Sequence, residues 1–224
     1  MTYLSPMSGA TSYIDIYCER TGPEFWSEPL NAVTNLAFLI AAAVLARLML
    51  RAGPAVRRDP ACWVFVGLVA AIGIGSGLFH TLAVRWAMLA DVIPIALFIL
   101  LFTYFALRRF AGAPWWAALA GVAAVIGVAA AVPALTGYRG GPYVAALVAM
   151  ILIGGYLRLV RHHPAGTALL AAAAVFVVSL ALRTADAPVC EALPSGTHYW
   201  WHLLNATVLF LVTRAMIRHG RTAG

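Results

Sequence analysis

The chain has 224 residues, of which 63% are hydrophobic and only 10% are charged. Its mean hydropathy is +0.89, and a water-soluble domain cannot bury so much apolar surface. Soluble domains, coiled coils and nucleic-acid binders are therefore excluded, and we interpret the net charge of +7 as a signal of membrane topology.

Seven apolar stretches, each about long enough to cross a bilayer as a helix, follow one another along the chain. Arg, Pro, Gly or polar turns separate them, and the sequence has none of the alternating segments that are typical of outer-membrane barrels. The expected fold class is all-α, a polytopic bundle of seven transmembrane helices that forms a single domain over residues 1–224. The predicted spans are approximately 29–50, 61–82, 87–107, 115–133, 141–160, 165–183 and 197–217.

The 15 basic residues other than histidine are all arginine, and 14 of them divide unequally between the two sides of the predicted bundle. By the positive-inside rule the richer side is cytoplasmic, which places the N-terminus outside and the C-terminus inside. The richer side has Arg51, Arg57, Arg58, Arg108, Arg109, Arg158, Arg161, Arg214, Arg218 and Arg221, and the other has Arg20, Arg85, Arg139 and Arg183.

Residues 1–28 form the extracytoplasmic N-terminal segment in this topology. The segment is acidic before the first span, unlike the basic start of a cleaved signal peptide. The all-arginine, alanine-rich composition is typical of a high-GC bacterial source. The expected location is therefore a bacterial inner membrane.

Three cysteines occur in the sequence. Cys18 and Cys190 fall on the predicted outer side, whereas Cys62 lies at the cytoplasmic end of the second span. An oxidising compartment would permit a bond between the first two. Spacing alone leaves a disulfide and two free thiols equally open, because geometry decides which forms.

Few polar residues interrupt the spans, and ionisable groups within a membrane usually mark a functional site. Ser76 and His80 are four residues apart in the second span, and His198 and His202 have the same spacing in the seventh, so each pair shares a helix face. Asp91 lies about one and a half turns into the third span. In the predicted topology all five lie toward the outer ends of their helices, where they can converge.

Three imidazoles from two helices predict a catalytic zinc site, because zinc accepts nitrogen ligands and a catalytic site leaves the fourth position to water. His80, His198 and His202 would be the ligands. Asp91 could serve as general base and later as general acid toward a leaving amine, and Ser76 could donate a hydrogen bond to a developing oxyanion.

Each of these residues also has a structural interpretation. A single buried histidine is more often a hydrogen-bonded packing residue than a ligand, although two imidazoles four residues apart favour a metal more strongly. Ser76 could bond to its own helix, and Asp91 could cap a helix or pair with Arg85. The HYWWH sequence lacks the glutamate of the HExxH protease motif.

These motifs together resemble a known family. GIGSGLFH at 73–80, an aspartate eleven residues after that histidine and HYWWHLL at 198–204 are similar to motifs of the alkaline ceramidases. These enzymes belong to a seven-helix hydrolase superfamily that includes the adiponectin and progestin receptors. Further similar segments are YCE at 17–19, EPLN at 28–31, TN at 34–35 and DAPVCE at 186–191.

The resemblance implies zinc on His80, His198 and His202, with Ser76 and Asp91 beside it as the catalytic residues. It also implies a disulfide between Cys18 and Cys190. The motifs at both ends and in the middle cover most of the chain, whereas the fourth and fifth spans carry none.

The family is also known for a calcium site in its N-terminal acidic segment. Glu19 and Glu28 match that pattern, but Asp15 lies one residue too far from the cysteine and the asparagine that should follow the glutamate is missing. Calcium takes six to eight oxygen ligands, and Asp15, Glu19, Glu28 and Asn31 supply four side chains. The resemblance therefore leaves calcium as an open candidate.

The expected function is zinc-dependent hydrolysis of an N-acyl lipid, such as ceramide, to a fatty acid and a sphingoid base near the periplasmic side. The expected partner is the membrane lipid substrate, with no nucleic acid and no obligate protein partner. Two alternatives are a lipid-sensing receptor of the same superfamily and a haem-binding electron-transfer bundle. A retinal protein is excluded because the chain has no lysine to form a Schiff base.

Overall fold

The computed structural model of the chain describes residues 9–220, so Arg221 of the predicted cytoplasmic set lies outside the described part. Within that part all regular elements are helices, and seven spans of 19 to 25 residues are long and apolar enough to cross a membrane. This confirms the all-α, seven-span prediction. The helices are α1 (Pro29–Thr34), α2 (Leu36–Arg51), α3 (Pro54–Arg57), α4 (Pro60–Leu82), α5 (Arg85–Arg109), α6 (Trp115–Thr136), α7 (Gly141–Leu159), α8 (Ala165–Val189) and α9 (His198–His219).

The predicted spans agree with the helices within a few residues, apart from two differences. The first span consists of α1 and α2, which are separated at Asn35. The last turns of α8 extend to Val189, although the prediction ended that span at 183. The helix continues past Arg183, whose guanidinium lies over the rings of Tyr143 and Trp201, 4.9 and 5.5 Å from their centroids. Such a contact offsets part of the cost of burying a charge.

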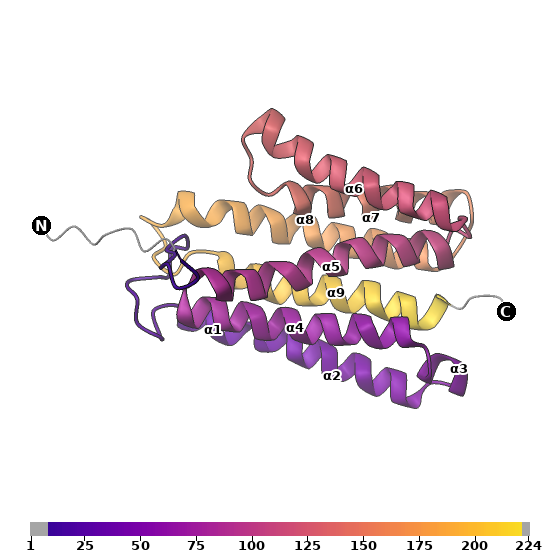
Figure 1. The fold of residues 1–224 in the computed structure, drawn as a ribbon, viewed down its shortest axis with the longest axis horizontal. Coiled ribbons are helices and arrows are strands. Elements are labelled where there is room, and N and C mark those ends of the chain that lie inside the picture. The colour runs from indigo at the N-terminus through magenta and orange to yellow at the C-terminus, as the bar shows by residue number, and fades with distance from the viewer. Residues whose placement is uncertain (1–8, 221–224) are drawn as a thin grey trace, which may run out of the picture.

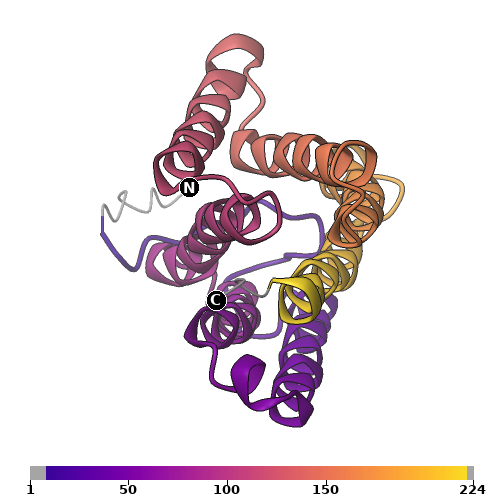
Figure 2. The same ribbon diagram turned by 90° about the vertical axis from the view of Figure 1, so that its right-hand side faces the viewer.

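Helices that are consecutive in the chain pack against one another, and α9 closes the bundle against α2 and α4 (Figures 1 and 2). The helices α4 and α9 form most of the interior. In the apolar part of these two spans 50% and 61% of the residues are buried, compared with 11% in α6. Figure 2 shows α6 at the periphery, beside α5 and α7. Side chains on α4 and α9 therefore face each other in the centre of the molecule.

The close approach of α4 to α5 depends on Gly75. A Cβ atom at this position would overlap the carbonyl group of Ala90 and would lie 2.9 Å from the backbone nitrogen of Asp91. Only glycine permits the two backbones to lie so near each other. This contact brings Ser76, the next residue of α4, beside Asp91 of α5.

The N-terminal segment lies across one end of the bundle, at the end where α9 begins (Figure 1). Its backbone pairs with residues 83–86, where α4 meets α5, through three hydrogen bonds: Ile14 N to Ala83 O (2.8 Å), Arg85 N to Ser12 O (3.2 Å) and Trp86 N to Ala10 O (3.0 Å). The predicted disulfide between Cys18 and Cys190 is present, with the two Cα atoms 5.2 Å apart. The segment is thereby fixed to the end of α8.

Loss of this disulfide is expected to destabilise the protein, because the bond closes a loop between residues 172 positions apart. Removing a native disulfide costs about 2–5 kcal/mol in small secreted domains. We expect Cys18→Ser/Cys190→Ser to lower the thermal denaturation temperature, and reductant to lower that of the wild type but not of the variant. Alkylation of both Cys18 and Cys190 in unreduced wild-type protein would contradict this assignment.

Candidate metal centre

Three histidines meet at the end of the bundle that the N-terminal segment covers. His80 lies in the last turn of α4, and His198 and His202 lie in the first turns of α9. Their side chains are 0%, 2% and 1% exposed, and one nitrogen from each forms a group within 4.8 Å. The structure thus brings together the three residues that the sequence predicts as metal ligands.

Hydrogen bonds on the far side of two rings define which nitrogen faces the centre. His80 Nδ1 lies 2.5 Å from Glu28 Oε2, and His202 Nδ1 lies 2.9 Å from Thr34 Oγ1. A carboxylate only accepts, and the Thr34 hydroxyl donates its proton to Leu30 O at 2.7 Å. Both Nδ1 atoms therefore carry protons, which leaves a lone pair on each Nε2.

These two lone pairs point at each other. His80 Nε2 and His202 Nε2 are 3.1 Å apart, and two unprotonated nitrogens at that distance repel each other unless a cation or a shared proton lies between them. Histidine ligands of metals commonly donate their other N–H to a carboxylate or another oxygen. The pairing with Glu28 and Thr34 therefore favours a metal site over packing alone.

His198 is held differently from the other two. Its ring stacks on Tyr17, with centroids 3.8 Å apart and planes 23° from parallel. Asp186 Oδ1 accepts hydrogen bonds from the backbone nitrogens of Thr197 (2.7 Å) and His198 (2.9 Å), which fixes the start of α9. Within the described residues His198 Nδ1 is buried without a hydrogen-bond partner, and coordination of a metal by this nitrogen would compensate for the cost of burying it.

The donor set has a definite chemical preference. Three neutral imidazoles suit zinc, copper, iron or nickel, whereas magnesium and calcium prefer oxygen. Three protein ligands also leave a fourth position open on a tetrahedral ion. The residues therefore fit a transition metal that acts on an exchangeable molecule.

The two predicted catalytic residues lie beside this centre. Ser76 is one turn before His80 on the same face of α4 and is 4% exposed. The Asp91 carboxylate of α5 lies near the Ser76 hydroxyl and within electrostatic range of His80 and Arg183. A carboxylate and a hydroxyl thus accompany the histidines, as the sequence predicts.

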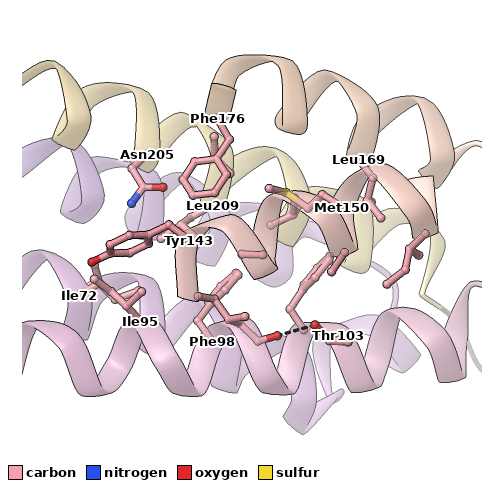
Figure 3. A pocket seen from close by; sticks show the side chains of 17 residues that line it. Ile72, Ile95, Phe98, Thr103, Tyr143, Met150, Leu169, Phe176, Asn205 and Leu209 are labelled. Carbon is pink, nitrogen blue, oxygen red and sulfur yellow. Dashed lines mark hydrogen bonds between the residues drawn. The ribbon is translucent and has the colours of Figure 1, made fainter. Parts of the chain in front are cut away.

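An apolar cavity runs along the helices (Figure 3), and three of its lining residues lie about one helical turn from the site: Ile72 precedes Ser76 by four residues, Ile95 follows Asp91 by four and Asn205 follows His202 by three. Tyr143 and Asn205 lie at one end of the cavity, and Leu169 lies at the other. Apart from Tyr143, Thr103 and Asn205, only apolar side chains line it. These are Ile72, Ile95, Phe98, Ile99, Phe102, Ala146, Ala149, Met150, Ile153, Leu169, Phe176, Val208, Leu209 and Val212.

Three of the four residues proposed for calcium lie together, because Asn31 donates from its backbone nitrogen to Glu19 Oε2 (2.8 Å) and from Nδ2 to Glu28 Oε2 (3.0 Å). The Asp15 side chain is exposed. Both carboxylate oxygens of Glu19 accept backbone hydrogen bonds at the start of α1, from Leu30 N (2.7 Å) and Asn31 N (2.8 Å). Glu28 faces His80, and within the described residues only the three histidines form a metal-capable group.

The two glutamates differ in their electrostatic surroundings. Burial raises the pKa of Glu19, and its two backbone hydrogen bonds only partly oppose that effect. Burial also favours the neutral form of Glu28, but hydrogen bonds from His80, Asn31 and Arg20 outweigh it and lower the pKa. Glu28 is therefore a carboxylate at neutral pH and accepts the proton of His80 Nδ1.

Sequence reasoning missed the partners that orient the histidines. It considered Glu28 only as a calcium ligand, and it used Thr34 and Asp186 only as parts of motifs. One signal was available, because buried histidine ligands require an acceptor for the second N–H. Glu28 and Thr34 lie at the start of the first span, at the depth predicted for the histidines.

Comparison with known proteins gives one result that covers nearly the whole chain. A family model described as Ceramidase matches residues 8–223. The matched range contains the three histidines, both bonded cysteines and all seven spans. No curated protein matches the chain.

Proposed function

Because the chain belongs to the ceramidase family, we propose that it is a zinc-dependent membrane hydrolase. Its substrate is an N-acyl lipid such as ceramide, which it cleaves to a fatty acid and a sphingoid base. The observation that carries this proposal is the group of three buried histidines on two of the helices that line an apolar cavity, with His202 one helical turn from Asn205 of its lining. An amide can reach the centre while its acyl chain lies in the cavity.

Zinc is the proposed metal because three neutral imidazoles with an open fourth position are typical of its catalytic sites. The chemistry that a bound zinc ion supplies is Lewis-acid polarisation and activation of water at neutral pH. His80, His198 and His202 would hold the ion. Glu28 and Thr34 keep the protons on the Nδ1 atoms and so keep two Nε2 lone pairs available.

Ser76 and Asp91 have complementary roles in amide cleavage. The Ser76 hydroxyl donates a hydrogen bond to the amide oxygen, whose negative charge grows as the carbonyl carbon is attacked. Asp91 accepts a proton from the attacking water and then transfers it to the nitrogen of the leaving amine. One group can perform both transfers because the C–N bond breaks after the proton has been taken up.

The lipid would enter from the membrane with its amide near the end of the bundle that carries the site. His198 is the first residue of α9, and His80 is two residues before the end of α4, so the centre lies close to the membrane interface. The arginine distribution supports an orientation in which this end faces the periplasm of a bacterial inner membrane. A polar headgroup could then remain near water while the acyl chain enters the cavity.

The cavity provides the test of the proposed substrate class. Ala149 lines the cavity, whereas the adjacent Val148 is 38% exposed on the outer surface. We expect Ala149→Phe to lower kcat/KM for a long-chain ceramide relative to a short-chain one by at least about fivefold. This corresponds to the lower end of the roughly 1–3 kcal/mol cost of overpacking. The matched control, Val148→Phe, should leave the ratio unchanged.

The two chain lengths are compared by fatty-acid release from purified protein in detergent. Equal ratios in the wild type and Ala149→Phe would show that the acyl chain does not occupy this cavity. Stoichiometric lipid binding without fatty-acid release would instead favour a lipid-sensing protein.

A further inference from the structure

A buried arginine occupies the middle of the N-terminal acidic segment. Arg20 is 6% exposed, and its guanidinium donates from Nε to Glu28, from Nη1 to Gly22 O (2.9 Å) and from Nη2 to His80 O (2.8 Å). Its charged group also lies 5.9 Å from the centroid of the Tyr13 ring. A buried cation with a carboxylate and two carbonyls around it is well satisfied.

The contacts of Arg20 lead directly to a histidine of the metal centre. Glu28 Oε1 accepts from Arg20, whereas Glu28 Oε2 accepts from His80 Nδ1 (2.5 Å) and from Asn31 Nδ2 (3.0 Å). Arg20 therefore contacts His80 twice, through its backbone carbonyl and, by way of Glu28, through its ring. Both contacts restrict the orientation of the imidazole.

The same arrangement does not fit a calcium ion. Calcium takes six to eight oxygens. Both oxygens of Glu19 and both of Glu28 already accept hydrogen bonds, and Asp15 is exposed. Among the described residues beside them, the only buried side-chain oxygens without a hydrogen-bond partner are Asn31 Oδ1 and Asn35 Oδ1, and two oxygens are too few. A divalent cation beside Glu28 would also be repelled by the Arg20 guanidinium, and burial strengthens that repulsion. The positive charge that these carboxylates need is thus part of the chain.

We propose that Arg20 is a built-in cation that makes the N-terminal segment independent of calcium, and that it is a positioning residue for the metal ligand His80 through Glu28. The second part rests on the proposed zinc site. Glu28 without its arginine would be a buried carboxylate whose remaining partners, His80 and Asn31, are neutral. It would hold the His80 ring less firmly.

The test compares zinc affinity, measured by competition with a chromogenic chelator, in wild type, Arg20→Gln, Arg20→Lys and Arg85→Gln. Loss of a group that orients a metal ligand typically costs 10–100-fold in metal affinity, and we expect a loss of that size in Arg20→Gln. Arg20→Lys keeps the charge but not the planar fork, so it should restore part of the affinity. Arg85, an exposed arginine at the same end of the bundle, is the matched control and should show no change.

Calcium is tested on the same preparations. We expect neither added calcium nor a calcium-selective chelator to change the thermal denaturation temperature or fatty-acid release of the wild type. If calcium changes the denaturation temperature or the fatty-acid release of the wild type, the proposal that Arg20 replaces calcium is wrong. If Arg20→Gln binds zinc as tightly as the wild type, Arg20 does not position His80. If Arg20→Gln does not fold, the comparison uses Arg20→Lys instead. Zinc affinity equal to that of the wild type in Arg20→Lys would then contradict the positioning role of Arg20.

The zinc measurement does not require turnover. A wild type that binds zinc but releases no fatty acid, together with weakened zinc binding in Arg20→Gln, would refute the proposed hydrolase and support the role of Arg20. Fatty-acid release by the wild type, together with normal zinc affinity in Arg20→Gln, would support the proposed hydrolase and refute the role of Arg20.

Discussion

His202→Ala is expected to lose both the bound metal and fatty-acid release. His202 is 1% exposed, its Nε2 lies 3.1 Å from that of His80, and Thr34 holds its ring in place. Two imidazoles cannot replace three as the ligands of a catalytic zinc ion. Because water needs the metal to ionise near pH 7, release should fall by more than about a thousandfold.

The measurement is the zinc content of purified protein, made beside fatty-acid release from a labelled short-chain ceramide. His219→Ala is the matched control, because His219 ends the same helix at the opposite side of the bundle. It should keep both zinc and activity. Full zinc content in His202→Ala would contradict the proposed ligand set.

Asp91→Asn is expected to abolish turnover while the metal stays bound. The amide has nearly the same shape as the carboxylate but cannot accept the proton of the attacking water. Loss of a positioned acid or base typically lowers kcat by about 10²–10⁴-fold. Zinc content should not change, because Asp91 is outside the group of three metal-capable histidines.

Ser76→Ala provides the comparison for Asp91→Asn. Removing one donor to a developing oxyanion costs about 10²–10³-fold in kcat, and Ser76→Ala should likewise leave zinc in place. Normal turnover by Asp91→Asn would remove the acid–base role of Asp91. Loss of zinc in that variant would show that the residue supports the metal centre instead.

The features that follow from short sequence patterns could be predicted. Seven apolar stretches imply seven spans, because an exposed backbone in lipid must form helices. The four-residue spacing of His198 and His202 places both on one helix face, and His80 lies at a similar depth in the second span. The resemblance to the family supplied the pairing of Cys18 with Cys190, which spacing alone did not decide.

The features that depend on contacts between distant segments could not be predicted. Arg183 suggested the end of a span, but in the structure it lies over two aromatic rings, from α7 and α9, and the helix continues. Arg20 read as one of the few basic residues on the outer side, although its side chain is buried against Glu28. A charge is placed correctly only when its partners are known, and these lie 8 to 60 residues away in the sequence.

The central claim is tested most directly by removing the metal from the wild type and restoring it. We predict one zinc ion per chain in purified protein, fatty-acid release that stops when a chelator strips the zinc, and recovery of release when zinc is returned. Protein that contains no zinc, yet has the three histidines buried and the fold intact, would contradict the account. Zinc-loaded protein that releases no fatty acid from ceramide or another N-acyl lipid would keep the metal centre and refute the hydrolase.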